Sequence, residues 1–311
     1  MTIMKAARIH DFGGPEVLKI EDVPVPQPRD DEVLVRISAA SINPVDYKTR
    51  EGKYPLVSRE KLPVTLGRDF SGVIESCGTR VHGFRKGDAI FALLGNDHGA
   101  FAEYCISRAT EFVLKPKSLD HLHAAAVPLV ALTAWQGLFD NGHLGEGQRV
   151  LIHGGAGGVG HLAIQLAKAK GAWVATTCSE GDMDFVRDLG ADQAIDYKRE
   201  KFENEVSDLD LVYDLIGGET QTRSFAVLKR GGTLISTLQQ PDESKAREKQ
   251  LRVGRYAAHP SAAQLGEVAQ LIDSGKVKVV VTETFAFGDV SKAEAFQEKE
   301  HPRGKVVLTV C

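Results

Sequence analysis

"HGGAGGVGHLAIQLAKAKGA", residues 153–172, joins a glycine-rich turn directly to an amphipathic helical pattern. The apolar run RVLIH at 149–153 leads into it, and Gly155, Gly157 and Gly160 fit the pattern GxGxxG. In that pattern the first glycine permits a tight turn, the second lets backbone approach a pyrophosphate, and the third lets helix and strand pack closely. The helix N-terminus then offers N–H groups and partial positive charge to the phosphates. The stretch predicts a dinucleotide-binding unit, with a tight turn that holds no ligand as the alternative.

Apolar runs and helical patterns go on alternating after this turn. We expect strands at 149–153, 173–178, 193–197, 210–216 and 233–238, and helices at 159–170, 182–189 and 220–228. Such alternation predicts a parallel sheet covered by helices. Before residue 121 the short strand patterns are separated by Pro, Gly and Asp, which favours an irregular antiparallel β-rich unit. One helix is expected at 124–141, where the two patterns meet.

The composition limits the kinds of partner. The chain has 311 residues, enough for two domains, and its 38 basic and 42 acidic side chains give a formal net charge of −4. Because no overall positive field attracts nucleic acid or anionic lipid, we expect small-molecule partners. The N-terminus lacks an apolar secretion signal, and the stretch 124–139 is too short to cross a bilayer, so a cytoplasmic protein is expected. The four widely spaced cysteines predict reduced thiols.

The end of the second predicted strand bears on the choice of cofactor. NAD-specific proteins place an Asp or Glu there, about 20 residues after the glycine turn, to bind the ribose hydroxyls. Here the strand ends Thr177-Cys178-Ser179, so a ribose 2′-phosphate meets no carboxylate at the tip. We therefore expect NADP(H). NAD(H) stays open, because Glu180 and Asp182 lie close by in the sequence and their charge opposes a phosphate.

A set of characteristic short stretches is spread along nearly the whole chain. They are INPVDYKTREGKYP (42–55), LGRDFSGVI (66–74), GAFAEY (99–104), AAVPLVALTAWQ (125–136), HGGAGGVGH (153–161), LGADQAIDY (189–197), DLIGGET (214–220) and RGKVVL (303–308). With them the chain resembles the medium-chain dehydrogenase/reductase superfamily, and within it the zinc-free quinone oxidoreductase branch that includes zeta-crystallin.

The resemblance implies an α/β fold in which a GroES-like β-rich catalytic domain carries an inserted Rossmann domain with a doubly wound parallel sheet. We expect the catalytic domain at 1–120 and 257–311, and the dinucleotide-binding domain at 121–256. The resemblance also implies a homodimer, and a cofactor that lies between the two domains.

The resemblance also implies that no catalytic zinc is bound. Zinc-dependent relatives hold the metal with an early Cys, a Gly-His-Glu motif and a later Cys or Asp, whereas this sequence has Pro44-Val45-Asp46 and Gly67-Arg68-Asp69 in the first two places. We expect a structural ion pair between Arg68 and Asp69. Without a Lewis acid, alcohol oxidation is disfavoured, and quinones or conjugated enones suit the site because nicotinamide reduces them with less electrophilic help.

Three residues of one loop are candidates for the chemistry. Asn43 matches the family asparagine that faces nicotinamide and substrate, with a cap on its own turn as the alternative. Tyr54 matches a tyrosine that relatives present to the substrate, where its phenol can donate a proton or a hydrogen bond after hydride transfer; packing on the loop is the alternative. Asp46 follows Asn43 as a secondary candidate for a polar network around the substrate.

The resemblance also assigns residues on the cofactor side. Thr133 matches a residue near the nicotinamide amide, with a hydroxyl bonded to its own helix as the alternative. Tyr197 matches a tyrosine beside the 2′-phosphate in NADPH-using relatives, whereas Asp182 stands where some of them carry a phosphate-binding lysine. Lys305, near the chain end, is expected to be an edge charge. The residues expected to bind the cofactor are Asn43, Thr133, Gly155, Ala156, Gly157, Gly158, Val159, Gly160, Ser179, Tyr197 and Gly217.

Together these features predict an NADPH-dependent oxidoreductase that transfers hydride from nicotinamide to a quinone or an α,β-unsaturated carbonyl acceptor without zinc. A non-catalytic NADPH-binding sensor or binding protein is the alternative; an RNA-binding form of it predicts a basic stripe with exposed aromatic residues, which the sequence does not show. A zinc alcohol dehydrogenase is the third hypothesis, and it predicts a bound metal.

Overall fold

The computed structural model describes residues 2–54, 57–300 and 302–310. The chain forms two compact units. The Rossmann unit consists of Val130–Ala258 and Ser274–Lys278, and the β-rich unit contains the other described residues. This division agrees with an α/β fold in which one part is β-rich and the other is a Rossmann unit.

The division differs from the expected boundaries at three short segments, of which 257–258 simply extends the Rossmann unit by two residues. Residues 121–129 belong to the β-rich unit because α2 (His121–Ala125) packs on its strands β3 (Glu32–Ile42) and β5 (Asp69–Cys77). Residues 274–278 belong to the Rossmann unit, where the Gln165 amide donates to the Lys278 carbonyl at 2.9 Å and accepts from its N–H at 2.7 Å.

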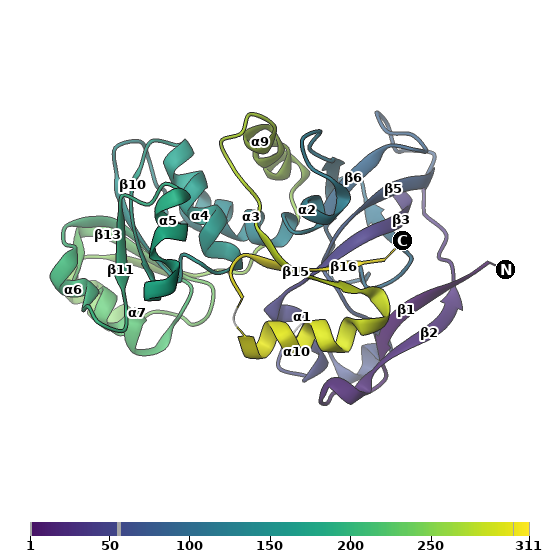
Figure 1. Ribbon diagram of the computed structural model, residues 1–311, viewed down its shortest axis with the longest axis horizontal. Helices are drawn as coiled ribbons and strands as arrows, with labels where there is room; N and C mark the ends of the chain where they lie inside the picture. The colour runs from purple at the N-terminus through teal and green to yellow at the C-terminus, as the bar shows by residue number, and fades with distance from the viewer. Residues whose placement is uncertain (1, 55–56, 301, 311) are drawn as a thin grey trace. The chain divides into compact units, whose positions relative to one another are not determined.

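The Rossmann unit is built on a parallel sheet with strand order β11-β10-β9-β12-β13-β14 (Figure 1). The strands are β9 (Arg149–His153), β10 (Trp173–Cys178), β11 (Gln193–Asp196), β12 (Leu209–Asp214), β13 (Leu228–Ser236) and β14 (Arg252–Arg255). The helices are α3 (Pro128–Trp135), the π-helix η3 (Gln136–Asn141), α4 (Gly158–Ala169), the short η4 (Glu180–Asp182), α5 (Met183–Asp188), α6 (Phe202–Glu205), α7 (Gly218–Ser224) and α8 (Glu243–Lys249). The strand order reverses between β9 and β12, the place where open α/β sheets bind ligands at the carboxyl ends of their strands.

The expected helix at 124–141 is wrong as a single element. α2 ends at Ala125, α3 begins at Pro128, and the π-helix follows it. Proline lacks an N–H and disfavours helical backbone in the residue before it, so a helix begins at Pro128 and does not run through it. The strand predicted at 210–216 ends at Asp214, the helix predicted at 220–228 ends at Ser224, and β14 had no sequence prediction.

The β-rich unit contains two sheets. One has the strand order β15-β16-β3-β5-β6-β8, with β7 also paired to β3, and the other has the order β2-β1-β4. Beyond β3 and β5, the strands are β1 (Ile3–Ile9), β2 (Leu18–Pro24), β4 (Val64–Thr65), β6 (Ala89–Leu93), β7 (Tyr104–Arg108), β8 (Phe112–Leu114), β15 (Val281–Ala286) and β16 (Lys305–Thr309). Besides α2, the helices are α1 (Pro44–Arg50), α9 (Ala262–Asp273), α10 (Val290–Glu300) and the short η1 (Pro15–Val17), η2 (Arg59–Lys61) and η5 (Phe287–Asp289).

Strands from early and late in the sequence meet in the larger sheet of this unit. β16 pairs antiparallel with β3, and Val306 lies opposite Ile42. This register brings Lys305, the first residue of β16, to the end of β3, where Asn43 is the N-cap of α1. Nearby, the buried Arg50 of α1 and Glu294 of α10 form an ion pair with 2.7 Å between Nε and Oε2. Within the described ranges, no helix is long and apolar enough to span a bilayer.

Candidate functional site

The turn between β9 and α4 has no room for side chains where its elements touch. The N–H groups of Gly154 and Gly155 donate to the Thr177 carbonyl at 3.2 and 3.0 Å. A Cβ atom on Gly155 would lie 2.1 Å from Thr176 Oγ1, and a Cβ atom on Gly160 would lie 2.2 Å from the Gly154 oxygen. Both positions require glycine because strand, turn and helix are in direct contact there.

Gly157 differs from these two glycines. A Cβ atom there would meet, among the described residues, only the Gly154 oxygen at 3.5 Å, which is ordinary van der Waals contact. Packing inside the protein therefore does not require this glycine. Gly157 immediately precedes α4, whose first-turn N–H groups have no acceptor within the helix and carry partial positive charge. Open space beside such amides fits the close approach of a pyrophosphate.

A buried histidine holds the start of this turn. His153, the last residue of β9, lies with Nδ1 3.1 Å from Thr177 Oγ1 and Nε2 2.9 Å from Ser224 Oγ. Burial lowers the pKa of His153 to about 4, so its imidazole is neutral near pH 7. Thr177 Oγ1 also accepts from the Gly154 N–H at 3.2 Å. Sequence reasoning missed this residue, although a histidine ending an apolar strand was a usable signal.

A buried carboxylate shapes the neighbouring bend after β12. Asp214 accepts through Oδ1 from the N–H groups of Ile216 and Gly217, at 3.0 and 2.8 Å, and through Oδ2 from Ser236 Oγ at 3.0 Å. These bonds end the strand at Asp214 and turn Gly217 to a φ of +78°. The bend adjoins the glycine turn, since a Cβ atom on Gly154 would lie 3.1 Å from Ile216 Cδ1. Asp214 was not among the predicted site residues.

Ser179 and Tyr197 follow neighbouring strands, β10 and β11. The Tyr197 N–H donates to the Cys178 carbonyl at 3.2 Å, and the Tyr197 side chain is 59% exposed. Ser179 Oγ donates a hydrogen bond to Asp182. The Lys198 ammonium lies 5.8 Å from the centre of the Tyr197 ring. The two expected phosphate-side residues therefore meet at one edge of the sheet, with one acidic and one basic neighbour.

Thr133 is buried in α3. Its carbonyl accepts a hydrogen bond from the Tyr213 hydroxyl at 3.0 Å and another from the Tyr256 hydroxyl. Burial raises the pKa of both phenols, so they stay protonated. This arrangement anchors the backbone at Thr133. Proximity of Thr133 to the nicotinamide stays a prediction.

Asn43 and Asp46 belong to a buried polar cluster at the end of β3. The Asn43 N–H donates to Asp46 Oδ2 at 2.7 Å. The Lys305 ammonium donates to the Asn43 side-chain oxygen and, at 2.8 Å, to the Ile42 carbonyl. Ser41 Oγ donates to Asp69 Oδ2 at 2.8 Å. The expectation that Lys305 is an edge charge is wrong, because pairing of β16 with β3 buries it.

Burial shifts the charge states in this cluster. It raises the pKa of Asp46, with the Glu294 charge adding to the effect, and it raises the pKa of Asp69. It lowers the pKa of Lys305, against the opposing pull of the Asp69 and Asp46 carboxylates. Asn43 is fully buried, and its amide nitrogen donates to the Ser41 carbonyl at 3.3 Å. These contacts fix Asn43 as the N-cap of α1. Contact of Asn43 with a substrate stays a prediction.

Tyr54 and Asp46 line the same small cavity of about 40 Å³ in the β-rich unit. Thr49 and Arg68 also line it. Tyr54 is half-buried, so its side chain contacts both solvent and protein. The structure therefore brings two of the three predicted catalytic residues to one cavity, with Asn43 directly bonded to one of them.

The residues at the positions of the family's metal ligands do not suit zinc. Arg68 donates through Nε and Nη2 to the Leu94 carbonyl, at 3.1 and 2.9 Å. A guanidinium stays charged and has no lone pair to offer a metal. Asp69 bonds Ser41 and lies near the Lys305 cation, so the expected Arg68–Asp69 ion pair is wrong: each side chain has another partner. The described residues also contain no group of three His, Cys, Asp or Glu side chains placed to hold a metal ion.

Two family descriptions match the chain. Residues 29–117 match the alcohol dehydrogenase GroES-like domain, and residues 189–308 match a zinc-binding dehydrogenase family. The protein named NAD(P)H oxidoreductase RTN4IP1, mitochondrial, of Mus musculus is 36% identical, over 99% of this chain and 90% of its own length. The 2-methylene-furan-3-one reductase of Solanum lycopersicum is 37% identical, over 98% of this chain and 79% of its own length.

Solved structures are similar over the whole chain. The quinone oxidoreductase from Coxiella burnetii superimposes with a TM-score of 0.93 at 36% identity, covering 100% of both chains. The Escherichia coli quinone oxidoreductase complexed with NADPH superimposes with a TM-score of 0.89 at 27% identity, covering 98% of this chain and 100% of its own.

Proposed function

The chain belongs to the zinc-free quinone oxidoreductase branch of the medium-chain dehydrogenase/reductase superfamily, and from this premise we propose which hydride transfer it carries out. It is an oxidoreductase and binds NADP(H). We propose that it reduces a quinone or an α,β-unsaturated carbonyl compound, with NADPH as the preferred donor and without zinc. Asn43, Asp46 and Tyr54 are the proposed catalytic residues.

The observation that carries this proposal is the position of Arg68. Its guanidinium bonds the Leu94 carbonyl where zinc-dependent relatives place a metal-binding histidine, so this position offers no ligand for a metal that would polarise a plain alcohol or ketone. Quinones and enones are electron-poor without such help. The Tyr54 cavity, bordered by Arg68, then needs to supply only orientation and a hydrogen bond.

Bound NADPH supplies a hydride, that is, one hydrogen with two electrons. In enone reduction the hydride adds to the β-carbon and the carbonyl oxygen gains negative charge. Tyr54 donates its proton toward that charge, and water returns a proton to the phenolate. A quinone collects its protons from water more readily, so Tyr54 contributes less to its reduction.

Asp46 and its partners prepare the loop for this step. Burial raises the pKa of Asp46, which keeps its carboxyl neutral to higher pH. The higher pKa reduces the repulsion between this carboxyl and the negative charge that develops on the acceptor. Asp46 also accepts a hydrogen bond from the Asn43 N–H at 2.7 Å, which fixes the start of α1.

The preference for NADPH is proposed to rest on Lys198. Asp182 occupies the position of the missing lysine and already accepts a bond from Ser179, so its charge opposes a 2′-phosphate. Arg199 is engaged by Glu180. Within the part of the chain that the structure describes, the Lys198 ammonium has no carboxylate partner, and it lies 5.8 Å from the Tyr197 ring centre. Lys198 therefore supplies the positive charge at this edge.

Acceptor specificity tests the proposal. Purified protein with NADPH is given 1,4-benzoquinone, an open-chain enone and the corresponding saturated ketone and alcohol. We expect turnover of the first two only, unaffected by a chelator. Tyr54→Phe should lower the enone rate about 100-fold and leave quinone reduction nearly unchanged. An unchanged enone rate would remove Tyr54 as the acid, and zinc-dependent alcohol oxidation would overturn the proposal.

We also propose that the protein forms a homodimer. β14 is an outer strand of the Rossmann sheet, and such an edge offers N–H and C=O groups for pairing with a second copy. Light scattering after size-exclusion chromatography measures the mass, and a monomer at all concentrations would contradict the proposal. The cytoplasmic location expected from the N-terminus stays a prediction, since the similar mouse protein is named as mitochondrial.

A further inference from the structure

The β-rich unit has a second, larger cavity of about 550 Å³, which we call the β1 cavity. It lies against β1, β2, β4 and β7 and the loop that follows β6. Its volume falls within the range of small-molecule sites, about 300 to 1,000 Å³. The apolar part of its lining includes Met4, Val23, Pro26, Val64, Ala102 and Ile106. The polar part includes Arg8, Lys61, Asn96, Asp97, His98 and Tyr104.

The β1 cavity adjoins the Tyr54 cavity. Both are lined by Lys61, Val64, Thr65, Asn96 and His98. The boundary is close-packed backbone at one point, because a Cβ atom on Gly99 would lie 2.2 Å from the Thr65 carbonyl oxygen. Elsewhere it includes Lys61 and Asn96, two exposed side chains. The two cavities are therefore neighbours, and these two exposed side chains form part of the boundary that a bound molecule would have to cross.

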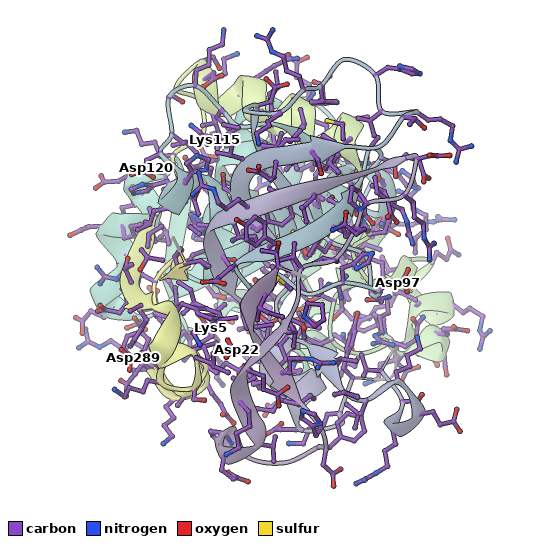
Figure 2. The ribbon with its side chains drawn as sticks, turned by 90° about the vertical axis from the view of Figure 1, so that its right-hand side faces the viewer. Lys5, Asp22, Asp97, Lys115, Asp120 and Asp289 are labelled. Carbon is purple, nitrogen blue, oxygen red and sulfur yellow. The ribbon has the colours of Figure 1, made fainter. Side chains whose placement is uncertain are left out.

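The pleat of β1 and β2 explains the apolar wall. Successive side chains of a strand point to opposite faces, and Met4 lies opposite Val23 in the antiparallel pair. Lys5 and Asp22, one position along, form an ion pair at 3.1 Å; they are labelled on these strands in Figure 2. The Lys5 and Asp22 side chains are exposed at this position, so Met4 and Val23 lie on the opposite side of the strand pair, where they line the cavity.

Two charged groups of the lining, Asp97 and Arg8, have partners within the protein. Asp97, also labelled in Figure 2, pairs with Arg108 at 2.8 Å, which lowers the pKa of Asp97. Arg8 donates to the Pro63 carbonyl at 3.0 Å and lies 3.6 Å from Glu21. An occupant does not need to satisfy these two groups, which favours an uncharged chain along the Met4 and Val23 wall.

We propose that the β1 cavity binds the aliphatic tail of an acceptor whose quinone or enone head lies at Tyr54. The preferred substrates are then acceptors with an alkyl or isoprenoid chain of several carbons, not small unsubstituted quinones. This inference rests on the proposed function, because the head group must be reduced at the Tyr54 cavity.

A chain-length series tests it. The value of kcat/KM is measured with saturating NADPH for 1,4-benzoquinones that carry no chain, a methyl, a hexyl or a decyl chain. Each methylene that enters the apolar cavity is expected to raise kcat/KM about fourfold until the cavity is full. A decyl compound with a terminal carboxylate should lose most of this gain. A flat series, or a carboxylate that improves on the plain chain, would overturn the tail assignment.

Val23→Phe and Val25→Phe provide a matched pair. Val23 lines the cavity. Val25 packs, as Val23 does, against the small apolar cluster of Met4, Ala6 and Ala102, but it is not part of the lining. Val23→Phe should remove the chain-length gain and leave reduction of the unsubstituted quinone unchanged, which also shows that the variant is folded. Val25→Phe should keep the gain. Equal chain-length profiles in both variants would contradict the cavity assignment, and failure of wild type to reduce any acceptor would instead overturn the proposed function itself.

Discussion

Lys305 donates a hydrogen bond to the side-chain oxygen of Asn43, although 262 residues separate them in the sequence. The pairing of β16 with β3 makes this contact possible. It fixes which side of the Asn43 amide is the acceptor, and so leaves the amide nitrogen to donate. The first and last parts of the chain thus build one site together.

Removing the Lys305 charge should destabilise the protein. In Lys305→Met the buried Asp69 and Asp46 lose their nearest cation, and removal of one partner from a buried charged cluster costs about 3 to 5 kcal/mol. Denaturant unfolding measures the change. Lys299→Met, at an exposed lysine of α10, is the control and should stay within about 0.5 kcal/mol of wild type. Equal stability of the two variants would show that Lys305 does not organise the cluster.

The glycine turn allows stability and binding to be separated. Gly157→Ala places a methyl group where the protein leaves space, so the free energy of unfolding should change by about 1 kcal/mol or less. The affinity for NADPH should fall at least about tenfold, because the methyl group occupies the space proposed for the pyrophosphate. Gly160→Ala forces a Cβ atom to 2.2 Å from the Gly154 oxygen and should lower stability as well. Calorimetric titration and thermal unfolding measure both properties. Unchanged NADPH affinity in Gly157→Ala would place the pyrophosphate elsewhere.

Substitutions that change the charge beside Tyr197 should alter the affinity for NADPH and leave the affinity for NADH unchanged. Lys198→Ala removes the proposed phosphate partner and should weaken NADPH binding about tenfold, the equivalent of about 1.4 kcal/mol for one charge-assisted hydrogen bond. Asp182→Asn removes the opposing charge and should tighten NADPH binding a few-fold. Lys201→Ala, an exposed lysine on the following segment, is the matched control. If NADH affinity shifts in parallel with that of NADPH, these residues do not read the 2′-phosphate.

The stability of the Rossmann unit should depend on pH through His153. Its folded pKa is about 4, below the ordinary 6.5, so between these values the unfolded chain binds the proton and the folded state does not. Stability is therefore lost as pH falls from 6.5 to 4, by at most about 3 kcal/mol. The raised pKa values of Asp46 and Asp69 act in the opposite direction, because they increase the stability as pH falls. They do so equally in wild type and in the variant His153→Gln.

His153→Gln isolates this contribution. The difference in unfolding free energy between wild type and variant should shrink steadily as pH falls from 7 to 4. His82→Gln, at an exposed histidine, should show a constant difference. A constant difference for His153→Gln as well would mean that the imidazole is not held neutral.

Much of the Rossmann unit follows from local sequence. β9, β10 and α4 lie where the apolar runs and the glycine turn predicted them, because strand and helix periods are set by neighbouring residues. The helix expected at 124–141 is broken because Pro128 outweighs the apolar pattern around it.

The candidate site was harder to predict because its contacts join distant segments. The burial of Lys305 depends on the pairing of β16 with β3, and no local pattern encodes that pairing. Asp214 acts through the N–H groups of Ile216 and Gly217 and through Ser236. His153 acts through Thr177 and Ser224, which lie on another strand and on a helix. The glycine turn was predictable because its glycine spacing lies within a few residues, although Thr176 and Thr177, which it contacts, come from the next strand.

Transfer of label tests the central claim most directly. NADPH deuterated on the transferred position is incubated with an enone and the protein in buffer freed of metal by chelator, and the product is examined by NMR spectroscopy. The account predicts one deuterium on the former β-carbon at an undiminished rate. A product without deuterium at that carbon, or activity that returns only with added zinc, would contradict it.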